Sequence, residues 1–193
     1  MDERIGQKTV GQEAIGQKTV GQKTVGQKAV GQKAVGQKAI ARQNNNRPIV
    51  GPIVEVAMAI LHRDGQFLMQ LRDDFEHIVH PGCWAFFGGH LEPGEAIISG
   101  VQRELAEELG YVPPKLSLFQ KNEDDAKRRY YYHGALTVPL EALQLNEGQD
   151  FALCSPADIE KGEKYSTRLG EVRSLGKPHQ EMLLAFIQSG LAG

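Results

Sequence analysis

Seven tandem pentapeptides run from Gly6 to Ile40 and divide the 193-residue chain into two unlike parts. Each unit reads Gly-Gln-(Lys/Glu)-(Thr/Ala)-(Val/Ile). A period of five rotates successive apolar side chains by about 140° on a helix and sends them to opposite faces of a strand, so neither element gains an apolar face. A glycine in every unit disfavours a helix further. We therefore expect residues 1–46 to form a disordered arm and residues 47–193 to form the folded domain.

Charge also differs between the two parts. Residues 1–46 carry eight Lys and Arg against three Asp and Glu, a balance of +5. The other 147 residues carry 14 basic and 21 acidic side chains, a balance of −7. The chain as a whole has a net charge of −2 and so gives no strong nucleic-acid signal. The arm alone would suit an acidic partner, as a weakly cationic tether.

The cysteine count and the apolar runs bear on the compartment. Cys83 and Cys154 are too few for a disulfide scaffold, so reduced thiols are expected. No run approaches the roughly 18 apolar residues of a membrane span. The N-terminus also lacks the apolar region of a signal peptide. These features predict a cytoplasmic protein without a membrane partner.

The pattern of residues 47–193 predicts strands and helices in mixed order. Asp64-Gly65 between two apolar runs is typical of a hairpin. Helical spacing of apolar residues ends at Gly110, which suits a helix C-terminus. The predicted strands are 53–61, 67–71, 84–87, 116–120, 130–138 and 151–154, and the predicted helices are 95–109, a short one from Ser155, and 179–188. Without regular βαβ alternation, this order predicts an α/β fold with helices packed on a mixed sheet.

Three glutamates gather on one turn of the predicted helix 95–109. At 100° per residue, Glu107 and Glu108 lie about −60° and +40° from Glu104, so the three carboxylates share a face. Their mutual repulsion rises near a sheet, and a divalent cation would neutralise it. Carboxylate oxygens suit Mg²⁺ or Mn²⁺. Taken alone, the cluster would be better read as the solvated acidic face of a surface helix.

The residues around this cluster complete a known signature. They fit the Nudix box, G-x5-E-x7-R-E-U-x-E-E-x-G-U, where U is aliphatic. The matching positions are Gly89, Glu95, Arg103, Glu104, Leu105, Glu107, Glu108 and Gly110. Only the last position departs, with Tyr111 in place of an aliphatic residue. The chain thus resembles the Nudix hydrolases over residues 47–193, while the pentapeptide arm lies outside the resemblance.

The resemblance implies an α/β/α sandwich and Mg²⁺-dependent hydrolysis of a nucleoside diphosphate linked to another group, with Mn²⁺ as an alternative ion. It makes Glu104, Glu107 and Glu108 metal ligands, one of them a candidate base, with the Gly88 carbonyl completing the shell. It implies that Glu95 and Arg103 orient these carboxylates through a charge-assisted bond. Glu147 resembles a further acidic ligand or base, with Asp150 as its nearest competitor. Arg72 and Tyr131 fall where relatives contact a phosphate and stack on a base.

Several functional questions stay open at this level. Phe87 stands where many relatives carry Pro, and His179 lies in a Pro-His-Gln segment that replaces the Asn with which one subgroup reads an oxidised guanine. Cys83 is expected to be buried rather than catalytic. The competing classes are a non-catalytic nucleotide-sensing module and an interaction protein that recruits a partner through its repeats. The substrate and the oligomeric state, a homodimer included, are not fixed by these residues.

Overall fold

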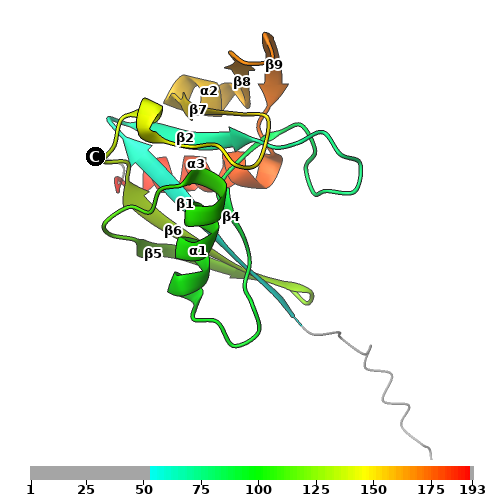
Figure 1. Ribbon diagram of the computed structural model, residues 1–193, viewed down its shortest axis with the longest axis vertical. Helices are drawn as coiled ribbons and strands as arrows, with labels where there is room; N and C mark the ends of the chain where they lie inside the picture. The colour runs from blue at the N-terminus through cyan, green and yellow to red at the C-terminus, as the bar shows by residue number, and fades with distance from the viewer. Residues whose placement is uncertain (1–52, 192–193) are drawn as a thin grey trace, which may run out of the picture. The chain divides into compact units, whose positions relative to one another are not determined.

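The protein was analysed as a computed structural model, which describes residues 53–191 (Figure 1). The expected disorder of residues 1–46 lies outside this range. No helix within it is long and apolar enough to cross a membrane.

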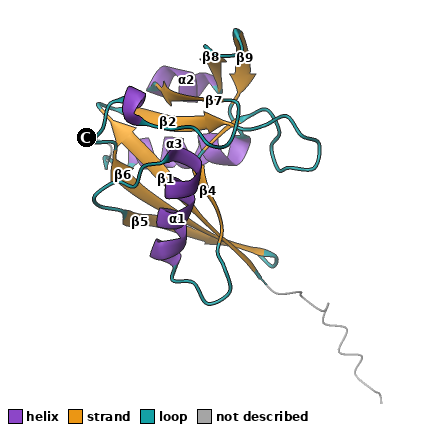
Figure 2. Cartoon of the chain, in the orientation of Figure 1, coloured by secondary structure: helices purple, strands orange, loops and turns teal. Residues whose placement is uncertain are grey.

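The elements follow the mixed order that the apolar patterns predict (Figure 2). The strands are β1 (Val54–Arg63), β2 (Gln66–Leu71), β3 (Trp84–Ala85), β4 (Phe87–His90), β5 (Ser117–Glu123), β6 (Lys127–Ala135), β7 (Asp150–Cys154), β8 (Glu163–Ser166) and β9 (Glu171–Ser174). The helices are α1 (Ile97–Leu109), α2 (Pro156–Lys161) and α3 (Lys177–Gln188), with a 3-10 turn η1 (Leu140–Ala142).

Strand β1 is the centre of a seven-stranded mixed sheet. The order is β3-β2-β1-β6-β5, with β4 pairing with β1 and β7 pairing with β2. Strand β1 runs parallel to β6, and the other pairs of this sheet are antiparallel. Along one edge, β1 pairs with β4 near its start and with β2 near its end. Gly88 and Gly89 of β4 border one cavity together with Arg72, which directly follows β2.

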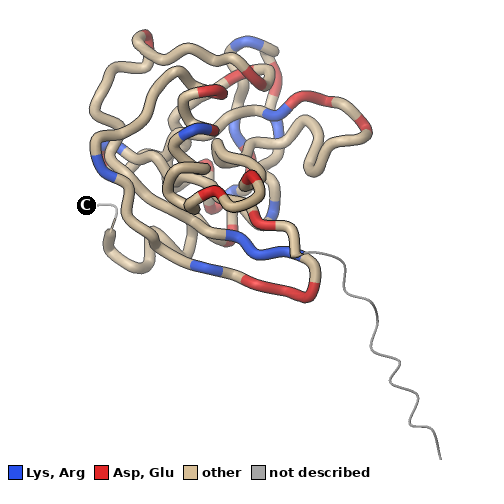
Figure 3. The backbone as a smooth tube through the Cα atoms, turned by 60° about the horizontal axis from the view of Figure 1, so that its bottom comes forward, with Lys and Arg blue, Asp and Glu red and all other residues tan. Residues whose placement is uncertain are grey.

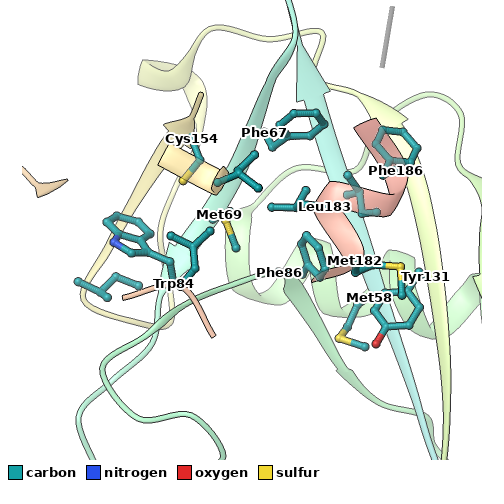
Figure 4. Packing of buried hydrophobic residues seen from close by; sticks show 14 residues of the cluster. Met58, Phe67, Met69, Trp84, Phe86, Tyr131, Cys154, Met182, Leu183 and Phe186 are labelled. Carbon is teal, nitrogen blue, oxygen red and sulfur yellow. The ribbon is translucent and has the colours of Figure 1, made fainter. Parts of the chain in front are cut away.

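Apolar side chains cover both faces of the sheet. On one face, Val101, Leu105 and Leu109 of α1 are fully buried against β1 and Phe87. On the other, Leu183 and Phe186 of α3 are fully buried in a cluster that includes aromatic and methionine side chains of the strands (Figure 4). The two helices therefore lie on opposite faces of the sheet, as Figure 1 shows, and the fold is the expected α/β/α sandwich.

Helix α1 begins two residues later than its apolar pattern predicts. Ala96 is the N-cap, with extended backbone angles. Glu95 instead forms a turn: its N–H donates to the Glu92 carbonyl, and its carboxylate accepts from the Glu92 N–H. The side chain of Glu95 is thereby placed across the start of the helix, toward Arg103.

The sequence patterns also missed two strands. Strands β8 and β9 form a separate two-stranded sheet, whose side chains include the exposed Tyr165 and Val172. Because this hairpin has little buried apolar surface of its own, it lacks the alternation on which strand prediction depends. Strand β6 begins at Lys127, three residues before the predicted start. Its first three residues are charged, so the apolar pattern did not include them, although they pair with β1.

Candidate active site

Helix α1 places two of its carboxylates beside β4. The buried side of the helix includes Glu108 and fixes the rotation of α1, so Glu104 and Glu108 face the strand segment that contains Gly88 and Gly89. Glu108 is only 5% exposed, and its Oε2 accepts hydrogen bonds from the Gly88 N–H at 2.8 Å and from Gln70 Nε2 at 3.4 Å. This carboxylate is held on the inside of the fold.

The two glycines of β4 make room for this approach. A Cβ at Gly89 would lie 2.6 Å from the carboxyl carbon of Glu104. Gly88 has a φ of 127°, which L side chains rarely adopt, and its Cβ would collide with the Ala57 carbonyl oxygen. A side chain at Gly89 would push Glu104 away from β4, and one at Gly88 would disturb the pairing of β4 with β1, so each glycine allows one close approach in the site.

Other carboxylates make a charge on Glu108 unfavourable. Burial raises the pKa of Glu108 to about 7; the Gly88 N–H lowers it, Glu104 and Glu147 raise it again, and Gln70 lowers it. Glu104 and Glu147 are therefore both within electrostatic reach of Glu108, which is withdrawn from water. A cation placed among them would relieve both the repulsion and the loss of hydration.

Arg103 joins Glu95, in the turn before α1, to Glu104 of the helix. Its Nε and Nη2 donate to the two oxygens of Glu95, each at 3.0 Å, and its Nη1 donates to Glu104 at 2.8 Å. Nη2 also donates to the His90 carbonyl oxygen at 3.0 Å. The hydrogen bonds from Arg103 hold the pKa of Glu95 below its usual value. The expected bond between Glu95 and Arg103 is thus present, and it fixes the guanidinium against Glu104.

Glu107 stands apart from the other two helical carboxylates. Its side chain is 59% exposed, contacts Arg103 Nη1 at 3.4 Å and does not line the cavity that Glu104 and Glu108 border. Among residues 53–191, no three His, Cys, Asp or Glu side chains lie close enough together to hold a metal ion in the present arrangement. The structure brings Glu104, Glu108 and Glu147 to one cavity and places Glu107 at its outside.

The cavity has a volume of about 930 Å³ and opens between β4, β6 and α3. Its floor consists of two cross-strand rows on the α3 face of the sheet. In the first, Arg129 is opposite Val56, and in the second, Tyr131 is opposite Met58. Gly88 continues the second row, because it pairs with Met58 from the other side. The register of β1 therefore brings the glycine pair and β6 into one site.

Basic side chains line the cavity opposite the carboxylates. Lys127 and Arg129 come from β6, and Figure 3 shows this basic stretch beside the acidic stretch at the end of the β5–β6 hairpin. The Nη1 of Arg129 contacts the Asp124 carboxylate at 2.8 Å. The cavity thus has the α1 carboxylates on its β4 side and two cations on its β6 side, with Glu181 of α3 as a further carboxylate in its lining.

Arg72 is a third cation of the cavity, lies beside the loop that bears Glu147, and is fixed from several directions. Its N–H donates to the Cys83 carbonyl at 3.0 Å, its Nε donates to the Val79 carbonyl at 2.9 Å, and its own carbonyl accepts from Gln149 Nε2 at 2.8 Å. Within residues 53–191, no hydrogen bond uses the two terminal nitrogens of the guanidinium. Arg72 is therefore preorganised at the edge of the cavity, as a phosphate contact would need.

Tyr131 also borders the cavity but belongs mainly to the core. It is 3% exposed and lies edge-on to Phe86, with ring centroids 6.2 Å apart. Figure 4 shows it beside Met58 and Met182. Burial raises the pKa of its hydroxyl. Little of the ring is left for a nucleobase, so packing accounts for most of its surface.

Glu147 and Asp150 have different surroundings. Glu147 is exposed and lines the cavity. Asp150 is buried, accepts a 2.6 Å hydrogen bond from the Ser166 hydroxyl, and accepts another from the Phe151 N–H at 2.8 Å. Asp150 thus joins β7 to β8, and of the two residues only Glu147 is free to serve the cavity.

Three of the residues that line the cavity were not among the site residues predicted from the sequence: Lys127, Arg129 and His179. Lys127 and Arg129 look like ordinary surface charges until the parallel register of β1 and β6 is known, although their alternation with Tyr131 was a usable signal. His179 of α3 lies against Phe86 and His80, with ring centroids 5.0 and 5.9 Å away. Burial lowers the pKa of His179 to about 3, with smaller contributions from His80 and Arg72.

The cysteines are both free. Cys154 is buried, whereas Cys83 is only half-buried, so the expectation of a buried Cys83 was wrong. Cys83 precedes β3 at the end of a surface loop, where the chain has not yet entered the core. Burial still raises the pKa of its thiol, which favours an inert thiol over a nucleophile.

Comparison with known proteins identifies the same region. The NUDIX domain family model matches residues 51–172. The chain is 32% identical over 108 residues to the CTP pyrophosphohydrolase of Escherichia coli K12, covering 55% of this chain and 78% of that protein. It is 42% identical over 131 residues to the nucleoside triphosphatase NudI of Escherichia coli K12 (strain DH10B), covering 58% and 84%.

A solved structure with the same fold is the NUDIX domain of Shewanella oneidensis NrtR, complexed with ADP ribose. It superposes with a TM-score of 0.56 at 18% identity, covering 75% of this chain and 94% of that one. Since the family model covers more than half of the chain and includes every residue of the Nudix box, the protein belongs to the Nudix family of hydrolases.

Proposed function

We propose that the protein is a Mg²⁺-dependent pyrophosphohydrolase that cleaves a nucleoside diphosphate linked to another group, with nucleoside triphosphates as the first substrates to test. The observation that carries this proposal is the two-sided cavity. Its lining combines the carboxylates Glu104, Glu108, Glu147 and Glu181 with the cations Arg72, Lys127 and Arg129. A polyphosphate with a bound dication carries both signs of charge and matches both sides. The names of the two bacterial relatives, a CTP pyrophosphohydrolase and a nucleoside triphosphatase, support the substrate class.

The donor set fits a hard divalent cation. Glu104 and Glu108 supply carboxylate oxygens, and the β4 backbone beside them supplies a carbonyl at Gly88. Oxygen-only donors are what Mg²⁺ and Mn²⁺ prefer. When bound, such an ion would neutralise phosphate charge and make a water molecule easier to deprotonate. Glu107, outside the cavity, is the weakest member of the ligand set that the family resemblance implies.

The protein's own residues would then bind and orient the substrate. Arg72 is held by the hydrogen bonds of its Nε and backbone, so its terminal nitrogens are ready to bind a phosphate without further ordering. Arg129 and Lys127 add charge on the opposite side. Glu147, exposed on its loop, is placed to accept a proton from the attacking water or to hold a further ion.

The test is a hydrolysis screen with nucleoside triphosphates, dinucleoside polyphosphates and nucleoside diphosphate sugars, each with Mg²⁺, Mn²⁺ and chelator. The proposal expects cleavage of at least one class, lost on chelation and lost in Glu108→Gln. Tight nucleotide binding without turnover would favour the sensing module instead.

A further inference from the structure

Gln70 lies in β2 with its carboxamide enclosed where three parts of the candidate site meet. The residue is 2% exposed. Its Nε2 donates to the Phe86 carbonyl at 3.2 Å and to Glu108 Oε2 at 3.4 Å. Its Oε1 lies 3.2 Å from where a Cβ on Gly148 would stand. One buried amide thus reaches the segment before Gly88, the helix α1 and the loop that bears Glu147.

The hydrogen bonds at Glu108 leave its two oxygens unequal. Both donors that the described residues provide, the Gly88 N–H and the Gln70 amide, bind Oε2. Within residues 53–191, no hydrogen bond reaches Oε1. A carboxylate oxygen that already accepts two donors has its lone pairs occupied, whereas the other remains available for a cation. The donors therefore leave Oε1 as the oxygen of Glu108 that can bind a cation.

Gln70 is suited to this role because its amide plane is fixed independently. An amide NH₂ has two donors. One is used by the Phe86 carbonyl, a buried backbone acceptor that requires a partner. The second is then directed at Glu108 without further freedom. A lysine at this position could not be oriented in the same way, since its three donors rotate.

We propose that Gln70 is a positioning residue, which binds Oε2 of Glu108 so that Oε1 is presented to the divalent cation. This inference rests on the proposed function, because it presumes that Glu108 holds the ion. A merely structural Gln70 would serve only the Phe86 carbonyl. The two roles differ in one observable: only the positioning role changes the affinity of the nucleotide-free protein for metal.

The experiment titrates Mn²⁺ into the metal-free, full-length chain without nucleotide and follows free Mn²⁺ by electron paramagnetic resonance. Removing a group that orients a metal ligand typically costs 10- to 100-fold in metal affinity, and we expect Gln70→Leu to weaken Mn²⁺ binding by about that factor. The matched control is Gln180→Leu. Gln180 Nε2 also donates to a backbone carbonyl, that of Ile159 at 2.7 Å, but does not line the cavity. This control should bind Mn²⁺ within about twofold of wild type.

The outcomes separate this inference from the proposed function. Absence of Mn²⁺ binding by the wild type would remove the proposed function and this inference with it. Wild-type binding that Gln70→Leu retains within about twofold would overturn the inference alone. Thermal melts of both variants report the structural cost. Gln70→Met, which fills the space with a flexible apolar chain, provides a second variant. If neither Gln70 variant folds, the amide is primarily structural, and the positioning role is likewise contradicted.

Discussion

The two sides of the cavity are built by different means. The carboxylates of Glu104 and Glu108 lie one helical turn apart on α1, so local geometry places them together. The cations Lys127 and Arg129 reach the cavity only because β6 pairs in parallel with β1, a contact across more than 70 residues of chain. On the first side Glu108 is fixed by buried hydrogen bonds, whereas on the second Arg129 forms an ion pair with Asp124 near the surface.

This difference predicts distinct functions for the two sides. A preorganised, poorly hydrated group contributes most where charge develops in the reaction. A mobile surface cation mainly attracts and retains the substrate. Substitutions on the carboxylate side should therefore lower kcat, and substitutions on the cationic side should raise KM.

The largest effect is expected at Glu108. Glu108→Gln retains an oxygen that accepts from the Gly88 N–H, but it removes the negative charge. We expect kcat to fall on the order of 10³-fold with little change in melting temperature. Glu107→Gln, on the same turn but outside the cavity, should lose only about 10-fold. Steady-state kinetics with Mg²⁺ would check both, and equal losses would contradict the separation of these two glutamates.

The next comparison sets Glu147 against Asp150. Glu147→Gln should lower kcat by about 10- to 100-fold without altering stability, because its side chain is exposed in the cavity. Asp150→Asn should instead lower the free energy of unfolding by about 1–3 kcal/mol, because the Ser166 hydroxyl and the Phe151 N–H lose a charged acceptor. Urea unfolding and steady-state kinetics of both variants would test these two expectations. A kinetic loss confined to Asp150→Asn would exchange the assigned roles.

On the cationic side, Arg129→Ala should raise KM for a nucleoside triphosphate about 10-fold, equivalent to about 1.4 kcal/mol, with kcat nearly unchanged. The difference should shrink at high salt, because the contact is near the surface. Arg128→Ala is the matched control: it removes a neighbouring cation that pairs with Glu55 and Glu123 and does not line the cavity. A similar rise in KM for both variants would mean that only overall charge matters.

The α3 side of the cavity has a pH signature. His179 has a folded-state pKa of about 3, below its ordinary value of 6.5, because burial disfavours its charged form. Its unfolded state therefore binds a proton first, and stability should fall as the pH drops below about 6.5 toward 3. Between pH 7 and 5, the wild type should lose about 1–2 kcal/mol more stability than His179→Asn, because Asn does not titrate. Urea melts at several pH values would measure it, and parallel losses in both proteins would exclude His179 as the source.

The smallest expected effect is that of the repeats. Deleting residues 1–46 should leave kcat/KM unchanged within about twofold, since the carboxylates and cations assigned to the cavity belong to residues 53–191. A large loss in the truncated protein would show that the repeat segment contributes to the site.

The distinction between local geometry and pairing of distant strands also explains which features could be predicted from the sequence. Helix α1, the β1–β2 hairpin and the carboxylates are local features, so spacing and turn residues were sufficient to find them. The parallel β1–β6 register, the burial of Glu108 compared with Glu107, and the enclosure of Gln70 depend on how distant elements pack. The β8–β9 hairpin was missed because it lacks an apolar face. Polar residues in strands were the least predictable, because their alternation does not indicate which face becomes a cavity.

The most direct test of the account is ³¹P NMR of wild-type protein with a nucleoside triphosphate, in Mg²⁺ and again after chelation. The account predicts a nucleoside monophosphate and pyrophosphate that accumulate only with Mg²⁺. Turnover that continues unchanged in excess chelator would contradict the central claim that the α1 carboxylates act through a divalent cation.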